Sequence, residues 1–152
     1  MCSYCGCRSI TVIGRLSEEH EHIVNHLGEV RRSCAAGDPE RVGRALDSLV
    51  EHLDPHTRSE ELGLFHVLRR NPEFTDHIDL LHTEHTGIDA LVAEMRAGDL
   101  DVLDELVDAL YEHIDKEENG LFPAAAIELD GPDWEEVVRL ADLGHVPNTA
   151  GH

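Results

Sequence analysis

The chain has 152 residues, a length typical of one domain with its own hydrophobic core. Its 12 Lys and Arg residues stand against 32 Asp and Glu residues, so the formal net charge is -20, and long-range repulsion argues against nucleic acid or anionic lipid as a partner. No apolar run approaches the roughly 18 residues of a membrane span, and the first ten residues lack the layout of a signal peptide, so we expect a cytoplasmic protein. The 12 His residues point instead to cations.

Three of the four Cys residues, Cys2, Cys5 and Cys7, crowd the N-terminus, whereas Cys34 stands alone. Cysteines at this spacing cannot stabilise the fold through disulfide bonds, and without an export signal we expect reduced thiols. The cluster is consistent with binding of a soft metal, with a flexible thiol-bearing arm, or with a tail packed on the domain. We assign residues 1–14 to a Cys-rich N-terminal arm.

Apolar residues at helical spacing predict four long amphipathic helices. These helices cover approximately residues 17–35, 39–70, 75–97 and 99–123. Ser17 is the expected N-cap of the first helix. Pro55 lies inside the second helix and predicts a kink there.

The connections between these helices are short, and no stretch alternates with the period of a strand. The sequence therefore predicts an all-α fold, an antiparallel up-down four-helix bundle over residues 15–130. Residues 131–152 are expected to form a short fifth helix, around 134–143, and a flexible tail from 145 to 152.

An internal repeat is the strongest signal in the sequence. Residues 56–65 and 113–122 both read His-x3-Glu-Glu-x-Gly-Leu-Phe, and residues 16–23 and 81–88 both read Leu-x2-Glu-His-x2-Ile. The chain therefore consists of two copies of one helical hairpin. Each copy carries one His on its first helix and a His-x3-Glu pair on its second.

The repeat predicts a buried metal site. Residues four apart lie on the same helix face, so the His and Glu of each pair can bind one ion. All four His also fall within the apolar stripe of their own helix, which predicts that they point into the core. The candidate metal ligands are His20, His56, Glu60, His85, His113 and Glu117. A single inward His is better explained as a hydrogen-bonded core residue, and a lone His-x3-Glu pair as a surface pair on a helix. Two copies in register instead favour a metal cluster, because unpaired buried charge is costly.

These residues resemble the hemerythrin-like (HHE cation-binding) family over about residues 15–125. The resemblance implies a four-helix bundle that holds a non-haem di-iron centre, two iron ions with an oxo or hydroxo bridge. It implies Glu60 and Glu117 as bridging carboxylates and the four His as terminal ligands. Members of the family are implicated in O2 carriage or sensing, in peroxide or nitric oxide handling, and in iron sensing or donation.

The chain departs from the oxygen-carrying hemerythrins, which use five His. The position of the additional His, four residues before the third-helix ligand, is Leu81 here. Two six-coordinate ions offer about twelve positions, and the predicted set fills ten, which leaves about two open. A further ligand could come from His52, which we rank first, or from His82 or His77; the alternative is an exposed or hydrogen-bonded His52.

Other polar residues near the motifs have different predicted roles. We expect Glu61 and Glu118 to orient ligand imidazoles through the far ring nitrogen or to be solvated. His22 should face solvent, His26 borders the apolar stripe, and Tyr111 should point away from the site.

Three classes of function fit this pattern. The first is a di-iron protein that binds O2 or reacts with peroxide or nitric oxide, with catalase-like peroxide disproportionation as an uncertain enzymatic version. The second is an iron or redox sensor without turnover, whose N-terminal thiols report to an unknown protein partner. The third is a structural bundle with zinc or no metal, although bridging carboxylates favour iron or manganese over zinc.

Overall fold

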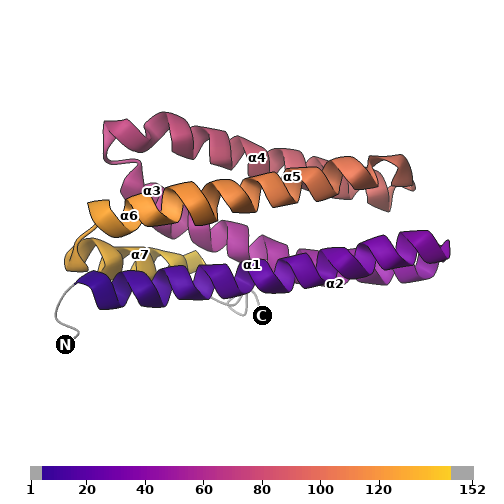
Figure 1. Ribbon diagram of the computed structural model, residues 1–152, viewed down its shortest axis with the longest axis horizontal. Coiled ribbons are helices and arrows are strands. Elements are labelled where there is room, and N and C mark those ends of the chain that lie inside the picture. Colours follow the sequence, from indigo (N-terminus) through magenta and orange to yellow (C-terminus); the bar gives the residue numbers. More distant parts are fainter. Residues whose placement is uncertain (1–4, 145–152) are drawn as a thin grey trace, which may run out of the picture.

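The computed structural model describes residues 5–144, and side chains from residue 11 to residue 143. Within this range the regular structure is helical, with no strand, and two helical hairpins lie against each other (Figure 1). The first hairpin is formed by α1 (Cys5–Ala36) and α2 (Pro39–Ser59), the second by α4 (Pro72–Arg96) and α5 (Leu103–Lys116). The predicted four-helix bundle with a C-terminal fifth helix is confirmed.

The second and fourth helices of the bundle are built alike. Each continues from an α-helix through a π-helical turn into a further short α-helix. The segments are η1 (Glu60–Leu64) and α3 (Phe65–Leu68) after α2, and η3 (Glu117–Leu121) and α6 (Phe122–Glu128) after α5, which is itself preceded by the 3-10 turn η2 (Leu100–Val102). The two π turns occupy equivalent positions in the sequence repeat.

Short side chains and glycines define the turns between the helices. Asp38 accepts hydrogen bonds from two backbone N–H groups at the start of α2, and Asn71 caps α4 in the same way. Gly37 (φ 68°) follows α1, and Gly98 (φ 106°) follows α4. Both glycines adopt the left-handed conformation that ends a helix.

Two helix boundaries differ from the sequence prediction. α1 begins at Cys5, well before Ser17, because Val12 and Leu16 extend its buried stripe into the core. α2 continues through Pro55 to Ser59, and the departure from α-helical hydrogen bonding comes at Glu60. Cys2 and the predicted tail over 145–152 lie outside the described residues.

The apolar core consists of two clusters at opposite ends of the bundle. On α1, Val12 and Leu16 belong to one cluster, and Ile23 and Leu27 belong to the other, with His20 between them. The other three predicted His ligands interrupt the core in the same way. The buried His and Glu residues therefore form a layer across the middle of the bundle. No helix in the described part of the chain is both long and apolar enough to cross a membrane.

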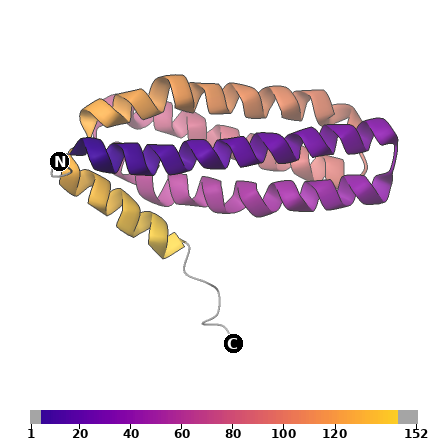
Figure 2. The same ribbon diagram turned by 60° about the horizontal axis from the view of Figure 1, so that its bottom comes forward.

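The fifth helix, α7 (Gly131–Gly144), lies obliquely across the outside of the bundle (Figure 2). It packs against η1, α1 and α2, and its Trp134 is fully buried. The contact with η1 is close, because a Cβ atom at Gly63 would lie 2.8 Å from the Val137 carbonyl oxygen and 3.2 Å from the Ala141 Cβ. α7 therefore rests directly on the first π turn.

We expect Gly63→Ala to destabilise the protein by about 1–3 kcal/mol, because the new methyl group meets the backbone of α7. Gly120 is its counterpart in the second repeat, where a Cβ would meet nothing within 4 Å. Gly120→Ala should therefore leave the free energy of unfolding unchanged or raise it by up to about 1 kcal/mol. Chemical denaturation of both variants checks this; equal losses would mean that contact with α7 is not the cause.

Candidate metal centre

The six predicted ligands converge in the middle of the bundle. Among the described residues, two groups bring possible ligand atoms within 4.8 Å of one another, and every member of both groups is buried. These groups are His20, His56, Glu60 and Glu117, and Glu60, His85, His113 and Glu117. Because the two carboxylates belong to both groups, the arrangement suits a binuclear metal site with shared carboxylates.

Each shared carboxylate faces one His of its own helix and one His of the other hairpin. The Glu60 oxygens lie 3.2 Å from Nε2 of His56 and 3.2 Å from Nε2 of His85. In the second repeat, the Glu117 oxygens lie 3.2 Å from Nε2 of His113 and 2.8 Å from Nε2 of His20. The carboxylates therefore join the two hairpins at the centre of the polar layer.

The outer nitrogen of every imidazole is bound to another glutamate. The Nδ1 distances are 2.6 Å for His20 to Glu118, 2.6 Å for His56 to Glu19, 2.8 Å for His85 to Glu61, and 2.7 Å for His113 to Glu84. Glu19 and Glu84 act within their own hairpin, whereas Glu61 and Glu118 reach across to the other one. The pattern follows the sequence repeat and gives the site an approximate twofold symmetry.

These outer hydrogen bonds determine which ring nitrogen of each imidazole is available to bind a metal ion. An imidazole that donates its Nδ1 hydrogen to a carboxylate presents a lone pair on Nε2, the form that binds metal ions. Nε2 of His85 lies 2.9 Å from Nε2 of His113. Among the described buried side chains, the atoms that lack a hydrogen-bond partner include His56 Nε2, both Glu60 oxygens and Glu117 Oε2. In a neutral imidazole, Nε2 carries a lone pair that faces the lone pairs of the carboxylate oxygens. Such buried atoms repel one another unless a cation lies between them.

The electrostatics of the site agree with this requirement. Burial opposes protonation, yet Glu60 and Glu19 raise the pKa of His56 to about 10. Burial is likewise outweighed at His85, whose pKa is raised to about 9 by Glu60 and Glu61. Burial also favours the neutral form of Glu60, but the adjacent His56 and His85 hold its pKa well below the ordinary value. The site therefore attracts positive charge, which protons supply when no metal is bound.

Three of the outer glutamates, Glu19, Glu61 and Glu84, are held as carboxylates. Although burial favours the neutral acid, hydrogen bonds to the imidazoles hold the pKa values of Glu19 and Glu61 below the ordinary value. Glu84 has a second cationic partner, Lys116, which with His113 lowers its pKa against the effect of burial. Each of these imidazoles thus has an ionised hydrogen-bond acceptor behind it.

The Phe that ends each repeat packs on an imidazole. Phe122 stacks on His20 with ring centroids 5.7 Å apart and planes 9° apart, and Phe65 stacks on His85 at 5.5 Å and 14°. Phe65 and Phe122 follow the π turns directly, and their N–H groups bond to the carbonyl oxygens of Glu60 and Glu117. The π turns therefore position the shared Glu and the stacking Phe of each repeat, and π turns are common at functional sites.

The orienting carboxylates were predicted in part. The role expected for Glu61 and Glu118 is what the geometry shows, whereas Glu19 and Glu84 were missed. The signal for them was present, because a Glu directly precedes the first-helix His in both repeats. A residue adjacent to His20 on a helix cannot reach the imidazole of His20, but it can reach a His on the neighbouring helix.

The remaining candidate residues lie outside the two buried groups. His52 is exposed and its Nδ1 donates to the Ser48 carbonyl oxygen at 3.0 Å. His82 is exposed beside Glu61, with 3.5 Å between Nε2 and Oε2, and His77 is half-buried. Three further residues lie away from the centre: His22, which is exposed as predicted, His26, which packs on His52, and Tyr111, which is exposed.

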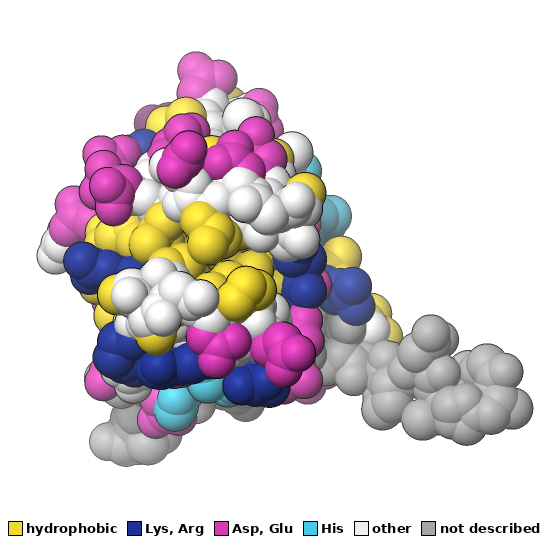
Figure 3. Space-filling view, turned by 90° about the vertical axis from the view of Figure 1, so that its right-hand side faces the viewer, with side chains coloured by type: hydrophobic (Ala, Val, Ile, Leu, Met, Phe, Trp, Pro, Cys, Tyr) yellow, Lys and Arg dark blue, Asp and Glu magenta, His cyan; other side chains and the backbone are white. Residues whose placement is uncertain are grey.

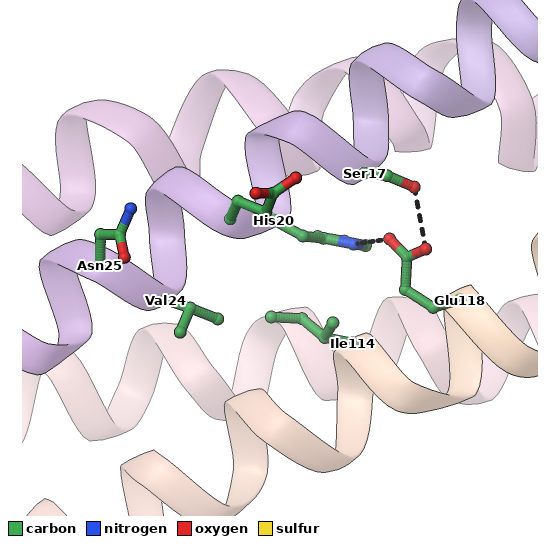
Figure 4. Close-up of a pocket in the computed structure, with 7 residues that line it drawn as sticks. Ser17, His20, Val24, Asn25, Ile114 and Glu118 are labelled. Carbon is green, nitrogen blue, oxygen red and sulfur yellow. Dashed lines mark hydrogen bonds and ion pairs between the residues drawn. The ribbon is translucent and has the colours of Figure 1, made fainter.

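A cavity of about 350 Å³ reaches the site from one side (Figure 4). It lies between α1 and the fourth helix of the bundle, and Val24 and Ile114 form its apolar lining. Glu118 lines it and joins His20 to Ser17, whose hydroxyl donates to the carboxylate at 2.8 Å. The cavity therefore borders one imidazole of the buried layer, that of His20, which is itself 3% exposed.

Comparison with known proteins agrees with this architecture. The chain belongs to the hemerythrin HHE cation-binding domain family, whose sequence profile matches residues 11–125. No curated protein and no solved structure matches the chain. The matched range contains all six converging residues and ends before α7.

We expect Glu19→Ala to weaken metal binding by about 10- to 100-fold, because His56 loses the acceptor that fixes its orientation and tautomer. Glu18→Ala is the matched control, since Glu18 is the exposed neighbour on the same helix. Metal retention against a competing chelator measures the difference. Equal retention by both variants would show that Glu19 does not support the site.

Proposed function

We propose that His20, His56, Glu60, His85, His113 and Glu117 bind two iron ions, and that the protein binds O2 or reacts with peroxide or nitric oxide at this centre. The observation that carries the proposal is the pair of buried carboxylates, each facing two imidazoles whose other nitrogen is bound to a glutamate. Like the di-metal centres of other helical bundles, this arrangement is built in the bundle core from side chains of facing helices, here with four imidazoles and two shared carboxylates.

The number of ligands favours iron or manganese over structural zinc. Each ion receives two imidazoles and one oxygen from each shared carboxylate, which makes four protein ligands. A bridging oxygen raises this to five, so a six-coordinate ion keeps one open position. Structural zinc sites are usually four-coordinate and closed, and they rarely share two carboxylates.

The protein's own residues would position and isolate the reacting centre. The iron pair, when bound, supplies reversible redox chemistry and open positions for a small ligand. The outer glutamates hold the imidazoles in one orientation, the stacked Phe rings limit their movement, and the two apolar clusters exclude water above and below the layer. The cavity beside His20 provides a route of entry.

The first experiment is metal analysis of aerobically purified protein, with absorption spectra recorded before and after reduction and after addition of O2 or peroxide. About two irons per chain and a reversible O2-dependent band support binding or sensing. Irreversible oxidation with rapid gas release from peroxide supports catalase-like turnover. One zinc or no metal per chain contradicts the proposal.

We expect Glu117→Ala to lose iron and, in the presence of iron, to lose at least about 2.7 kcal/mol of stability, the contribution of a ligand at 100 times its Kd. Without metal the difference should shrink or reverse, because the substitution removes a buried carboxylate. Glu112→Ala, at an exposed site on the same helix, is the control. Metal content and thermal unfolding, measured with and without iron, check this. Unchanged iron content would show that Glu117 is not a ligand.

We expect Ile114→Phe to slow the reaction of the reduced, iron-loaded protein with O2 several-fold, because the larger side chain fills the cavity beside His20. The matched control is Ala109→Phe. This substitution also enlarges a half-buried side chain of the same helix, but one that lines a different groove. Stopped-flow absorption gives the rates, and the resting spectrum verifies that both centres are intact. If both variants react at the wild-type rate, this cavity is not the route.

A further inference from the structure

Three His residues that the buried centre does not use lie together on the outside of the bundle. His22 and His26 belong to α1, and His52 belongs to α2. The ring centroid of His52 is 4.2 Å from that of His26 and 5.9 Å from that of His22. His22 and His52 are exposed and His26 is half-buried. We call these three residues the outer His cluster.

The position of the outer His cluster follows from the helix pairing. His22 and His26 are four residues apart, so they lie one above the other on the same face of α1. α1 and α2 pack along each other, which brings His52 from the neighbouring helix against this pair. Figure 3 shows some His side chains at the lower edge of the molecule, where α1 and α2 lie in Figure 1.

The imidazoles of this cluster are in a form suited to metal binding. His52 donates its Nδ1 hydrogen to the Ser48 carbonyl oxygen, which leaves the lone pair on Nε2. Partial burial and the neighbouring His52 and His22 lower the pKa of His26, so this ring is neutral at pH 7. Glu51 lies close enough to act on His26 electrostatically, and it adds a negative charge beside the three rings.

Small side-chain movements are required before one ion can touch all three rings. The possible ligand atoms of the outer cluster do not all lie within 4.8 Å, unlike those of the buried groups. His22 is the side chain that has to turn, since its ring is the farther one from His52, and its exposure permits this rotation. His26 and His52 already stack at 4.2 Å.

We propose that His22, His26 and His52 form a second, surface metal site that binds one divalent transition ion of the Zn²⁺, Ni²⁺ or Cu²⁺ type, with water in the remaining position. Imidazole nitrogen is a preferred ligand of these ions, and three such nitrogens with an open position make a common site. The net charge of -20 favours a cation. The site is independent of the buried centre and of the function proposed for it.

The test is calorimetric titration of Ni²⁺ into tag-free, iron-loaded protein. The titration is made in a background with Cys2, Cys5 and Cys7 replaced by Ser, because their thiols could also bind the ion. We expect one equivalent to bind, and we expect His22→Gln, His26→Gln and His52→Gln each to weaken it about tenfold or more, which is about 1.4 kcal/mol. His66→Gln, at an exposed His of α3, is the matched control.

Further readouts separate this site from the buried centre. Iron content and the iron absorption spectrum should be the same in His52→Gln and in the parent, because His52 is outside the buried groups. The Cu²⁺-loaded protein should show nitrogen hyperfine coupling that His52→Gln diminishes. The proposal is overturned if no equivalent of Ni²⁺ binds once the thiols are removed, or if His66→Gln weakens binding as much as His52→Gln.

Discussion

The structure depends on two carboxylates that have no contact with solvent. Glu60 and Glu117 are 0% exposed and lie in the middle of the bundle, where an ionised carboxylate is stable only beside positive charge. A neutral imidazole that directs its Nδ1 hydrogen to an outer glutamate has no hydrogen left on Nε2 to donate to Glu60 or Glu117. Metal ions meet this demand, and protons on the imidazoles meet it when metal is absent. The negative field that raises the pKa of His56 to about 10 also favours binding of a multivalent cation.

The polar layer explains the arrangement of the rest of the bundle. It separates two apolar clusters, each of which packs without polar interruption. The shared Glu of each repeat begins a π turn, and the Phe that follows the turn covers an imidazole of the other hairpin. Backbone irregularity, aromatic stacking and outer hydrogen bonds therefore occur at the same level of the bundle. All of them restrict the orientation of the Nε2 atoms that face the two buried carboxylates.

The twofold symmetry of the site is broken outside it. α7 packs on the first π turn at Gly63, whereas the equivalent Gly120 has open space around it. Lys116 pairs with Glu84, while the matching Glu19 has the more distant Arg15, at 3.9 Å, as its cationic neighbour. The cavity beside His20 adds a third difference. The two buried His and Glu groups thus contain the same kinds of side chains but have different surroundings.

The sequence alone determined the helices and the six converging residues. Apolar periodicity and capping residues depend on local geometry, and His-x3-Glu pairs share a helix face wherever the helix lies. The repeat then showed that two such pairs belong to one centre. Only the tertiary structure decided which glutamate meets which imidazole, because His20 and Glu118 are 98 residues apart and depend on how the hairpins pack.

Packing between helices also decided the other features that local patterns left open. The periodicity of the sequence does not predict the two π turns, and the packing of η1 against α7 joins segments far apart in the chain. His52 is one turn before His56 on α2, but packing of α1 against α2 leaves it on the outside, beside His26. The start of α1 at Cys5 likewise depends on the cluster that buries Val12 and Leu16, which includes residues from the far end of the chain. Contacts between distant segments have no signature in the periodicity of either segment alone.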